Sequence, residues 1–419
     1  MTLTYEDLKF PVYVNTRVIG SVGGTLLTVE DAVRAALVSR SNMLLVGSRG
    51  TGKTQAAKDI LYNFFGGNGL DAEGRPDFKL DELFTRVRLD KLKDAATSDD
   101  IIELTSKLTY PVFFIDELNR CPEITQNQFF SLANGELKHK GKPYPLGNKD
   151  YSVAIATANL GNGEYTGTFS IDAALLDRFH LILDLDFWRK TAEDEEAISL
   201  MKRDPRVKQA ATRDITDKIV EAYKMLGQPS DEMELVGRYL TQGIDYCQTF
   251  PAAQHSKRVL GKKWPVICHE KQCALRDTAC GIARPLEERA AQTILRLAQG
   301  FEYVAKLKDA KATPDSVNSV LLAYTLIAPH TKALSQQYIS KDENFSNPSL
   351  AGVNAVAELR KELDKLNAKD GKVMKAFAYA KHGNDKRLID ELDEQFGYLK
   401  PFLRRASQKQ GGAQAGAAQ

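Results

Sequence analysis

The chain has 419 residues, of which 43% are hydrophobic and 27% are charged, and its formal net charge is +2. The composition is that of a folded globular protein, the length favours two or three domains, and the small net charge gives no general case for nucleic-acid binding. No apolar run approaches the roughly 18 to 20 residues of a membrane helix. The N-terminal MTLTYEDLKF lacks the basic start and apolar core of a signal peptide, so we expect a cytoplasmic protein.

The first half of the chain alternates segments of helical and of strand character. TVEDAVRAALVSR predicts a helix, because Thr28 can accept hydrogen bonds from its first turn and the alanines and Leu37 form one apolar face. Strand-like runs and helix-like runs then alternate. The predicted strands are SNMLLVG (41–47), LFTRVRL (83–89), YPVFFIDE (110–117) and YSVAIATAN (151–159). The predicted helices are KTQAAKDILYNFF (53–65) and QNQFFSLANGEL (126–137). This order predicts an α/β domain with a parallel sheet between helices.

After Phe187 the strand-like runs thin out, and helical periodicity dominates. The helix-like runs are DEEAISLMKRD (194–204), DITDKIVEAYKML (214–226), DEMELVGRYLTQGIDY (231–246), LEERAAQTILRLAQ (286–299) and GVNAVAELRKELDKLNAK (352–369). SQKQGGAQAGAAQ at the C-terminus has too few apolar residues to fold. We therefore predict four parts: an α/β domain 1–188, an all-helical domain 189–328 with a cysteine-containing insertion at about 247–281, a helical extension 329–402, and a disordered tail 403–419.

A phosphate-binding loop is predicted between the first buried strand and the helix that follows it. Gly47, Gly52, Lys53 and Thr54 match the pattern G-x-x-x-x-G-K-[ST] in the strand–loop–helix context that this motif requires. Backbone N–H groups of such a loop converge on phosphate oxygens, the lysine reaches the β and γ phosphates, and the threonine holds Mg²⁺. The alternative is a glycine turn with a solvated lysine. The predicted nucleotide contacts are Gly47, Ser48, Arg49, Gly50, Thr51, Gly52, Lys53, Thr54 and Gln55.

An acidic pair follows the strand VFFI. Asp116 is placed to order Mg²⁺ and its waters, and Glu117 can polarise the water that attacks the γ phosphate. An Asp-Glu pair alone is often only a polar strand end. Its combination with the phosphate loop predicts hydrolysis of ATP with Mg²⁺ as the metal cofactor.

The order of these motifs resembles the AAA+ ATPases, and more closely their MoxR branch in the helix-2-insert clade, over roughly residues 10 to 325. The resemblance is carried by GSRGTGKT, DELNRCPEITQNQFFSLANGELKHKGKPYPL, IATANLGNGEY and ALLDRF, which occur in family order. The hairpin sequence GELKHKGKPYPLGN is similar to the insertion of that clade. Its basic residues, Lys138, His139, Lys140 and Lys142, can meet a client or nucleic acid, although a basic turn is usually only solvated.

The resemblance implies further site residues. Asn159 corresponds to the sensor-1 polar group beside the γ phosphate, although an asparagine at a strand end is more often a turn former. Arg178 corresponds to the arginine finger that acts on the nucleotide of the next subunit, and its ordinary alternative is a surface pair with Asp177. Arg289 is our choice for the lid arginine, with Arg284 as its rival, because the usual glycine-serine-proline-arginine approach is absent.

Four of the five cysteines, Cys247, Cys268, Cys273 and Cys280, lie close together in the predicted insertion, with His255 and His269 among them. Four thiolates can bind zinc or an iron–sulfur cluster, and metal binding would stabilise an insertion that has no long apolar periodicity. The spacing lacks the C-x2-C pairs of zinc ribbons. Buried cysteines and a redox pair therefore stay open as alternatives. The fifth, Cys121, is expected to be a packed small residue.

Three functions are compatible with these features. The first is a ring-forming Mg-ATPase that remodels a protein client; the resemblance implies a homohexamer and a partner with a von Willebrand factor A (VWA) domain. The second is a nucleic-acid-stimulated motor or translocase with a metal cluster in its insertion, which is motivated by the basic hairpin and by the cysteine insertion. The third is a nucleotide-gated scaffold with little turnover. A ring is expected because Arg178 has no obvious phosphate within its own subunit.

Overall fold

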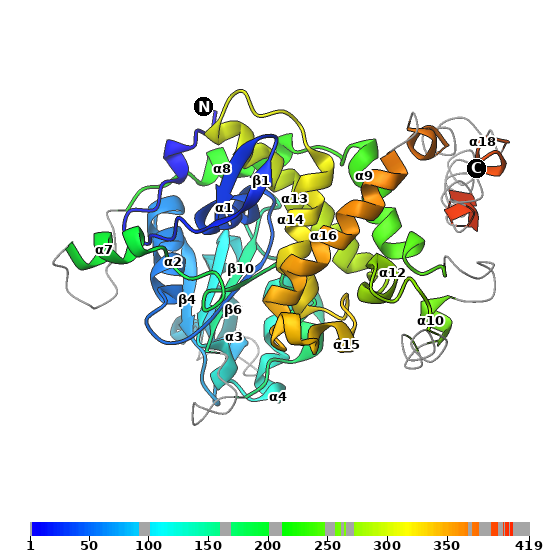
Figure 1. Ribbon diagram of the computed structural model, residues 1–419. Coiled ribbons are helices and arrows are strands. Elements are labelled where there is room, and N and C mark those ends of the chain that lie inside the picture. Colours follow the sequence, from blue (N-terminus) through cyan, green and yellow to red (C-terminus); the bar gives the residue numbers. More distant parts are fainter. Residues whose placement is uncertain are drawn as a thin grey trace. The chain divides into compact units, whose positions relative to one another are not determined.

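The computed structural model of the chain is shown in Figure 1. It describes residues 2–91, 101–159, 169–200, 212–247, 256–260, 264, 272–367, 371–376, 387–392, 397, 399–401 and 403–404. The chain forms two compact units: Met1–Gly227 with Tyr303–Thr313, and Gln228–Glu302 with Pro314–Gln419. The predicted domain boundaries at 188, 328 and 402 stay predictions, and the predicted tail lies almost wholly outside the described residues.

The first unit is built on a five-stranded parallel sheet. Its strand order is β11-β3-β10-β7-β4, and the strands are β3 (Met43–Val46), β4 (Gly69–Glu73), β7 (Val112–Asp116), β10 (Val153–Ala158) and β11 (Leu181–Asp184). β3 and β10 are buried along their whole length, as expected of inner strands of a parallel sheet with both faces covered. Helices α2 and α5 both contact β10, and the predicted fold class, a parallel sheet between helices followed by a helical region, is confirmed.

Three of the four predicted strands belong to this sheet, and the fourth does not. The run LFTRVRL divides into the end of helix α3 (Leu80–Phe84) and strand β5 (Thr85–Val87), which pairs antiparallel with β6 (Ile102–Leu104) outside the sheet. Arg88 binds Glu103 across this hairpin at 2.8 Å, and such charged side chains favour the solvated hairpin over a buried strand. The second strand of the sheet is instead β4, whose polar sequence GLDAE suits an edge position.

The helix that carries Thr28 begins as predicted. Thr28 accepts a hydrogen bond from the backbone of Asp31, and the Asp31 side chain accepts from the Thr28 backbone in return, which makes a capping box. The other elements of the first unit are β1 (Val18–Val22), β2 (Thr25–Thr28), α1 (Val29–Val38), α2 (Lys53–Asp59) with a π-helical turn (Ile60–Phe64), α4 (Glu123–Gln126), α5 (Phe129–Asn134), the hairpin strands β8 (Glu136–His139) and β9 (Lys142–Pro145), α6 (Ala173–Leu176), α7 (Ala192–Leu200) and α8 (Thr216–Met225).

The described part of the second unit is helical and contains no strand element. Helix α14 is buried along almost its whole length and contacts both α9 and α16. The elements are α9 (Asp231–Arg238) with a π-helical turn (Tyr239–Gly243), α10 (Lys257–Leu260), α12 (Ala279–Ile282), α13 (Glu288–Lys308), whose last residues belong to the first unit, α14 (Ser316–Ile327), α15 (Gln336–Ile339), α16 (Pro348–Asn367) and α18 (Arg387–Asp390). No helix in the described residues is long and apolar enough to cross a membrane.

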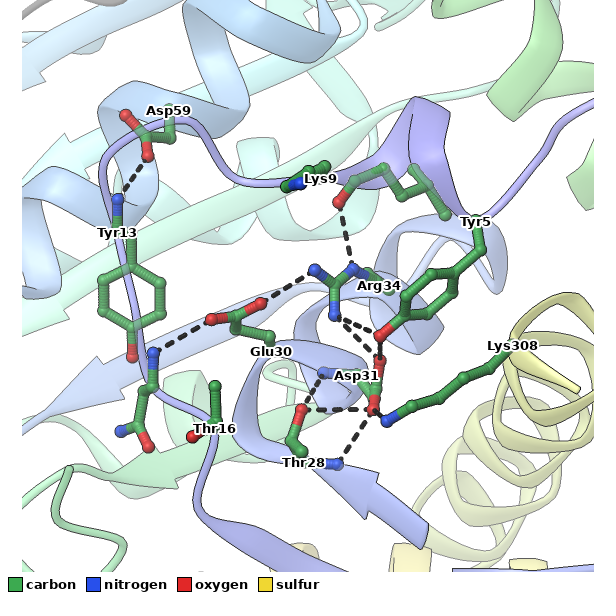
Figure 2. Close-up of polar contacts among 12 residues, drawn as sticks. Tyr5, Lys9, Tyr13, Thr16, Thr28, Glu30, Asp31, Arg34, Asp59 and Lys308 are labelled. Atoms are coloured by element: carbon green, nitrogen blue, oxygen red, sulfur yellow. Dashed lines mark hydrogen bonds and ion pairs between the residues drawn. The ribbon is translucent and has the colours of Figure 1, made fainter. Parts of the chain in front are cut away.

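A buried ionic network fixes the N-terminal segment of the first unit to helix α1 (Figure 2). The Asp31 carboxylate, which is fully buried, accepts hydrogen bonds from the Tyr5 hydroxyl at 2.7 Å, from Arg34 at 2.8 Å and from Lys308 at 2.7 Å. Burial acts to raise the pKa of Asp31, but Arg34 and Lys308 outweigh it and lower that pKa. A single carboxylate therefore joins three segments that are far apart in the sequence.

We expect Asp31→Asn to lower the free energy of unfolding of the first unit by about 3 kcal/mol, because it leaves the buried Arg34 with one anionic partner fewer. Urea denaturation followed by circular dichroism measures this loss. Since the pKa of Asp31 is lowered on folding, its stabilisation is present above about pH 3.9 and is lost as the pH falls below that value. Asp217→Asn, at an exposed ion pair with Lys149, is the control and should change nothing measurable; equal stability of the two variants contradicts the prediction.

Candidate nucleotide site at the carboxyl edge of the sheet

The predicted site residues meet at one edge of the sheet because of the strand register. Val46 at the end of β3 lies opposite Ala158 of β10 and Asp184 of β11, and Ile115 of β7 lies opposite Ala156 of β10. Parallel strands in this register end together, so the loops after β3, β7, β10 and β11 all begin at the same edge. This is where ligands bind in open α/β sheets.

Lys53 is folded back onto its own loop. Its ammonium group donates hydrogen bonds to the carbonyls of Gly47 at 2.8 Å and Ser48 at 2.7 Å, and the residue is only 7% exposed. Burial lowers the pKa of Lys53, and the carboxylates of Asp186 and Asp116 oppose that effect. The lysine is therefore held within the loop by weak neutral acceptors, from which an anionic ligand can draw it.

Thr54 and Asp116 face each other as the motif predicts. The Thr54 hydroxyl lies 3.1 and 3.2 Å from the two carboxylate oxygens of Asp116. The hydroxyl of Thr157 on β10 donates to the same carboxylate at 2.5 Å. A hydroxyl and a carboxylate form the hard oxygen ligand set that Mg²⁺ prefers in nucleotide sites, so the residues present fit that ion.

The second carboxylate of the pair lies beside the predicted sensor residue. The side-chain amide of Asn159, a buried residue, is 3.4 Å from a carboxylate oxygen of Glu117, and the other oxygen forms an ion pair with Arg120 at 2.6 Å. The backbone of Glu117 is in the left-handed region, with φ of 53°, and its N–H donates to Thr157 at 2.8 Å. A non-glycine residue in this conformation is strained, and such strain concentrates at functional sites.

Three supporting residues were not singled out from the sequence as members of the site. Thr157 bonds both members of the acidic pair. Asn119 is 2% exposed and clasps the backbone of Asn159, donating to its carbonyl at 2.8 Å and accepting from its N–H at 3.3 Å. Arg120 holds Glu117. The signals that the sequence offers for them are a threonine inside the apolar run VAIATA and the Asn-Arg that follows the acidic pair after Leu118.

Arg178, the predicted arginine finger, is partly exposed on the loop between α6 and β11. Its guanidinium lies over the ring of Phe130 at 4.3 Å, donates to the side chain of Asn134 at 3.0 Å, and also donates to the carbonyl of Ala174. The predicted role toward a neighbouring subunit stays a prediction.

The two rival lid arginines belong to the second unit. Arg289 is exposed on α13. Arg284 is partly buried, lies over the ring of Trp264 at 5.5 Å, and has a buried Nε without a hydrogen-bond partner in the described structure. The choice between them stays a prediction.

The predicted four-thiolate site is only partly described. Cys247, Cys273 and Cys280 are partly buried and form no disulfide, whereas Cys268, like His255 and His269, lies outside the described residues. In the described ranges no group of three or more His, Cys, Asp and Glu side chains is arranged to hold a metal. Zinc or iron–sulfur binding therefore stays a prediction. Cys121 is fully buried, as expected of a packed residue, and burial raises the pKa of its thiol to about 11.

Comparisons with known proteins agree with this geometry. Residues 42–179 match the family model described as AAA domain (dynein-related subfamily). A crystal structure of a protein from Cytophaga hutchinsonii, described as a candidate ATPase, has the same fold, with a TM-score of 0.51 and 15% sequence identity over 78% of this chain and 88% of the other. A search of curated proteins finds no match. Residues 42–179 thus form an AAA ATPase domain, which makes the protein a P-loop NTPase.

Proposed function

We propose that the protein is a Mg²⁺-dependent ATPase of the MoxR branch of the AAA+ proteins, which assembles into a ring and remodels a protein client. The observation that carries the proposal is the convergence of the site residues at one edge of the sheet: Thr54 lies within hydrogen-bond reach of Asp116, and Asn159 within reach of Glu117. Lys53 lies on the phosphate loop at the same edge, bonded to the carbonyls of Gly47 and Ser48. These are the parts that phosphoryl transfer requires: a lysine for the phosphates, ligands for the metal, and a carboxylate with an amide for the water.

The chemistry follows from these positions. On binding of ATP, Lys53 exchanges the loop carbonyls for the β and γ phosphates, because a charged acceptor forms the stronger hydrogen bond. Thr54 and Asp116 would hold Mg²⁺, which neutralises charge on the same phosphates when it is bound. Glu117 accepts a proton from the attacking water or polarises it, and the amide of Asn159 fixes the direction of attack. Arg120 holds the Glu117 carboxylate in an ion pair, and this ion pair has to loosen before the carboxylate can act on the water.

Isothermal titration calorimetry of the intact, folded chain with ATP and Mg²⁺ tests this proposal directly. Saturable binding that requires an intact phosphate loop is the expected result. No heat of binding for adenine or guanine nucleotides at millimolar concentration contradicts it.

The ring follows from the proposed role of Arg178 as a trans-acting finger. We expect Arg178→Ala to retain ATP binding and to lower turnover at least 100-fold, because a guanidinium that stabilises the transition-state charge contributes a factor of about 10³ or more. Steady-state hydrolysis and calorimetry on the same sample separate the two effects.

Asn134→Ala is the matched control, because it removes a partner of Arg178 within the chain and keeps the arginine. It should turn over at close to the normal rate. If it loses as much activity as Arg178→Ala, Arg178 acts by bracing its own subunit; normal hydrolysis by Arg178→Ala under conditions where the protein is monomeric also discards the trans finger.

The resemblance supports the finer parts of the proposal: a homohexameric ring, and a partner that carries a VWA domain. An affinity pull-down with the Glu117→Gln variant, which we expect to hold ATP without hydrolysing it, is the experiment that identifies the client. Metal binding by the cysteine insertion, as zinc or an iron–sulfur cluster, is a separate proposal that rests on the cysteine spacing alone.

A nucleic-acid motor is the second candidate, and the hairpin β8–β9 supports it. Lys138, Lys140 and Lys142 are all exposed on this hairpin. Stimulation of the ATPase rate by DNA or RNA that weakens steeply as salt is added would favour the motor over protein remodelling, because phosphate contacts release counterions.

A further inference from the structure

A second lysine lies against the phosphate loop from outside the loop's own sequence. Lys190 follows β11 by six residues, and its ammonium group donates a hydrogen bond to the carbonyl of Thr51 at 2.5 Å. A Cβ placed on Gly52 would lie 3.1 Å from the same ammonium nitrogen. Lys190 therefore touches the two loop residues that directly precede Lys53.

This cation has no anionic partner in the described residues. No ion pair of Lys190 occurs there; its other neighbour is the ring of Tyr13, at 5.7 Å from the ammonium nitrogen. Burial lowers the pKa of Lys190, and the acidic groups nearest to it, Asp194 and Glu195, only oppose that effect from a distance. The Asp194 carboxylate already accepts hydrogen bonds from Thr16 and Thr191. A half-buried cation without a counterion is unfavourable, so a ligand anion would complete this position.

The surroundings of Lys190 are fixed in place. The backbone N–H of Tyr13 donates at 2.7 Å to Asp59, a fully buried residue at the end of α2, as Figure 2 shows. The side-chain amide of Asn15 donates at 3.0 Å to the carbonyl of Trp188. Helix α2, the N-terminal segment and the segment that carries Lys190 are thus tied to one another, and α2 is the helix that begins at Lys53.

We propose that Lys190 is a second nucleotide-binding lysine, which donates to a phosphate that ATP and ADP have in common. The inference rests on the proposed nucleotide site. Lys53 holds the carbonyls at the start of the loop, whereas Lys190 holds a carbonyl at its end. The two ammonium groups therefore approach the loop from different segments, and a polyphosphate bound along the loop lies within the field of both.

The variant Lys190→Gln tests this assignment, because a glutamine amide can still donate to the Thr51 carbonyl but carries no charge. We expect the dissociation constants for Mg-ATP and Mg-ADP, measured by calorimetry, to rise by the same factor of about ten. KM should rise with them while kcat stays unchanged, since binding is lost equally in the ground and transition states. Lys190→Arg should keep most of the affinity. Lys149→Gln, at an exposed lysine of the same unit, should bind like the unmodified chain.

Unchanged affinity of Lys190→Gln for both nucleotides overturns the inference. A purely structural brace also overturns it, and would be recognised by a lower melting temperature of nucleotide-free Lys190→Gln together with an affinity that Lys190→Arg does not restore. If the unmodified chain binds no nucleotide, the proposed function fails first. If that chain binds normally and only the Lys190 comparison fails, the proposed function stands.

Discussion

Replacement of Lys53 by alanine is expected to weaken ATP binding on the order of 100-fold or more and to abolish hydrolysis. The lysine is the buried cation within the loop, and it donates to two neutral carbonyls that can be exchanged for phosphate oxygens. Each hydrogen bond between a charged donor and an acceptor contributes about 1.5 to 3 kcal/mol, and two such bonds account for the factor. Calorimetry with Mg-ATP and a phosphate-release assay measure the two losses.

Lys58→Ala is the matched control for this prediction, because Lys58 lies on the same helix and pairs with Asp71 of the edge strand β4. It should bind ATP normally. Circular dichroism of both variants confirms that the helix is intact. Retention of near-normal affinity by Lys53→Ala would mean that the loop does not bind the phosphates, and the proposed mechanism would have to be given up.

Glu117→Gln is expected to bind ATP as tightly as the unmodified chain and to lose turnover by a factor of at least 100. The two side chains have the same shape, and the amide can still accept from Arg120. An amide cannot take the proton of the attacking water, and general-base catalysis of this kind contributes about 10² to 10⁴ in rate. Single-turnover hydrolysis isolates this step from product release.

Glu123→Gln, at an exposed carboxylate of α4, is the control and should hydrolyse ATP normally. Normal hydrolysis by Glu117→Gln would remove Glu117 from the mechanism. If Glu117→Gln also left biological function intact while Lys53→Ala abolished it, the chain would act as a nucleotide-gated scaffold.

The inner part of the sheet was predictable from the sequence, whereas its edges were not. β3, β7 and β10 are apolar runs that end in a motif or a polar residue. The apolar run predicts a buried strand, and the residues that follow it show where the strand ends. β4 was missed because Gly69, Asp71 and Glu73 are residues that strands generally avoid, and only pairing with β7 makes the segment a strand. β11 was missed because its four residues were not distinguished from the helical region that follows.

The site shows the same division between local and distant information. Lys53, Thr54 and Asp116 follow from a motif whose spacing reflects the chemistry of phosphate binding, and the structure brings Thr54 and Asp116 together. Thr157 and Lys190 reach the site only through strand register and through the return of the chain after β11. A single sequence does not show such proximity. Lys190 is more than a hundred residues from the loop residue that it contacts, and Thr157 is about forty residues from Asp116.

The placement of β10 between β3 and β7 has a consequence for how the protein tolerates change. Strand β3, which precedes the nucleotide loop, and strand β7, which ends in the acidic pair, are separated by two interstrand steps of about 4.8 Å each. Thr157 bonds the middle strand, β10, to Asp116. The alignment of the phosphate loop with the acidic pair is therefore set by the spacing of the main chains, which hardly depends on side-chain identity. A bulkier residue in place of Ile155, which is fully buried on β10 between β3 and β7, should therefore misalign the reaction centre although Ile155 carries no chemistry itself.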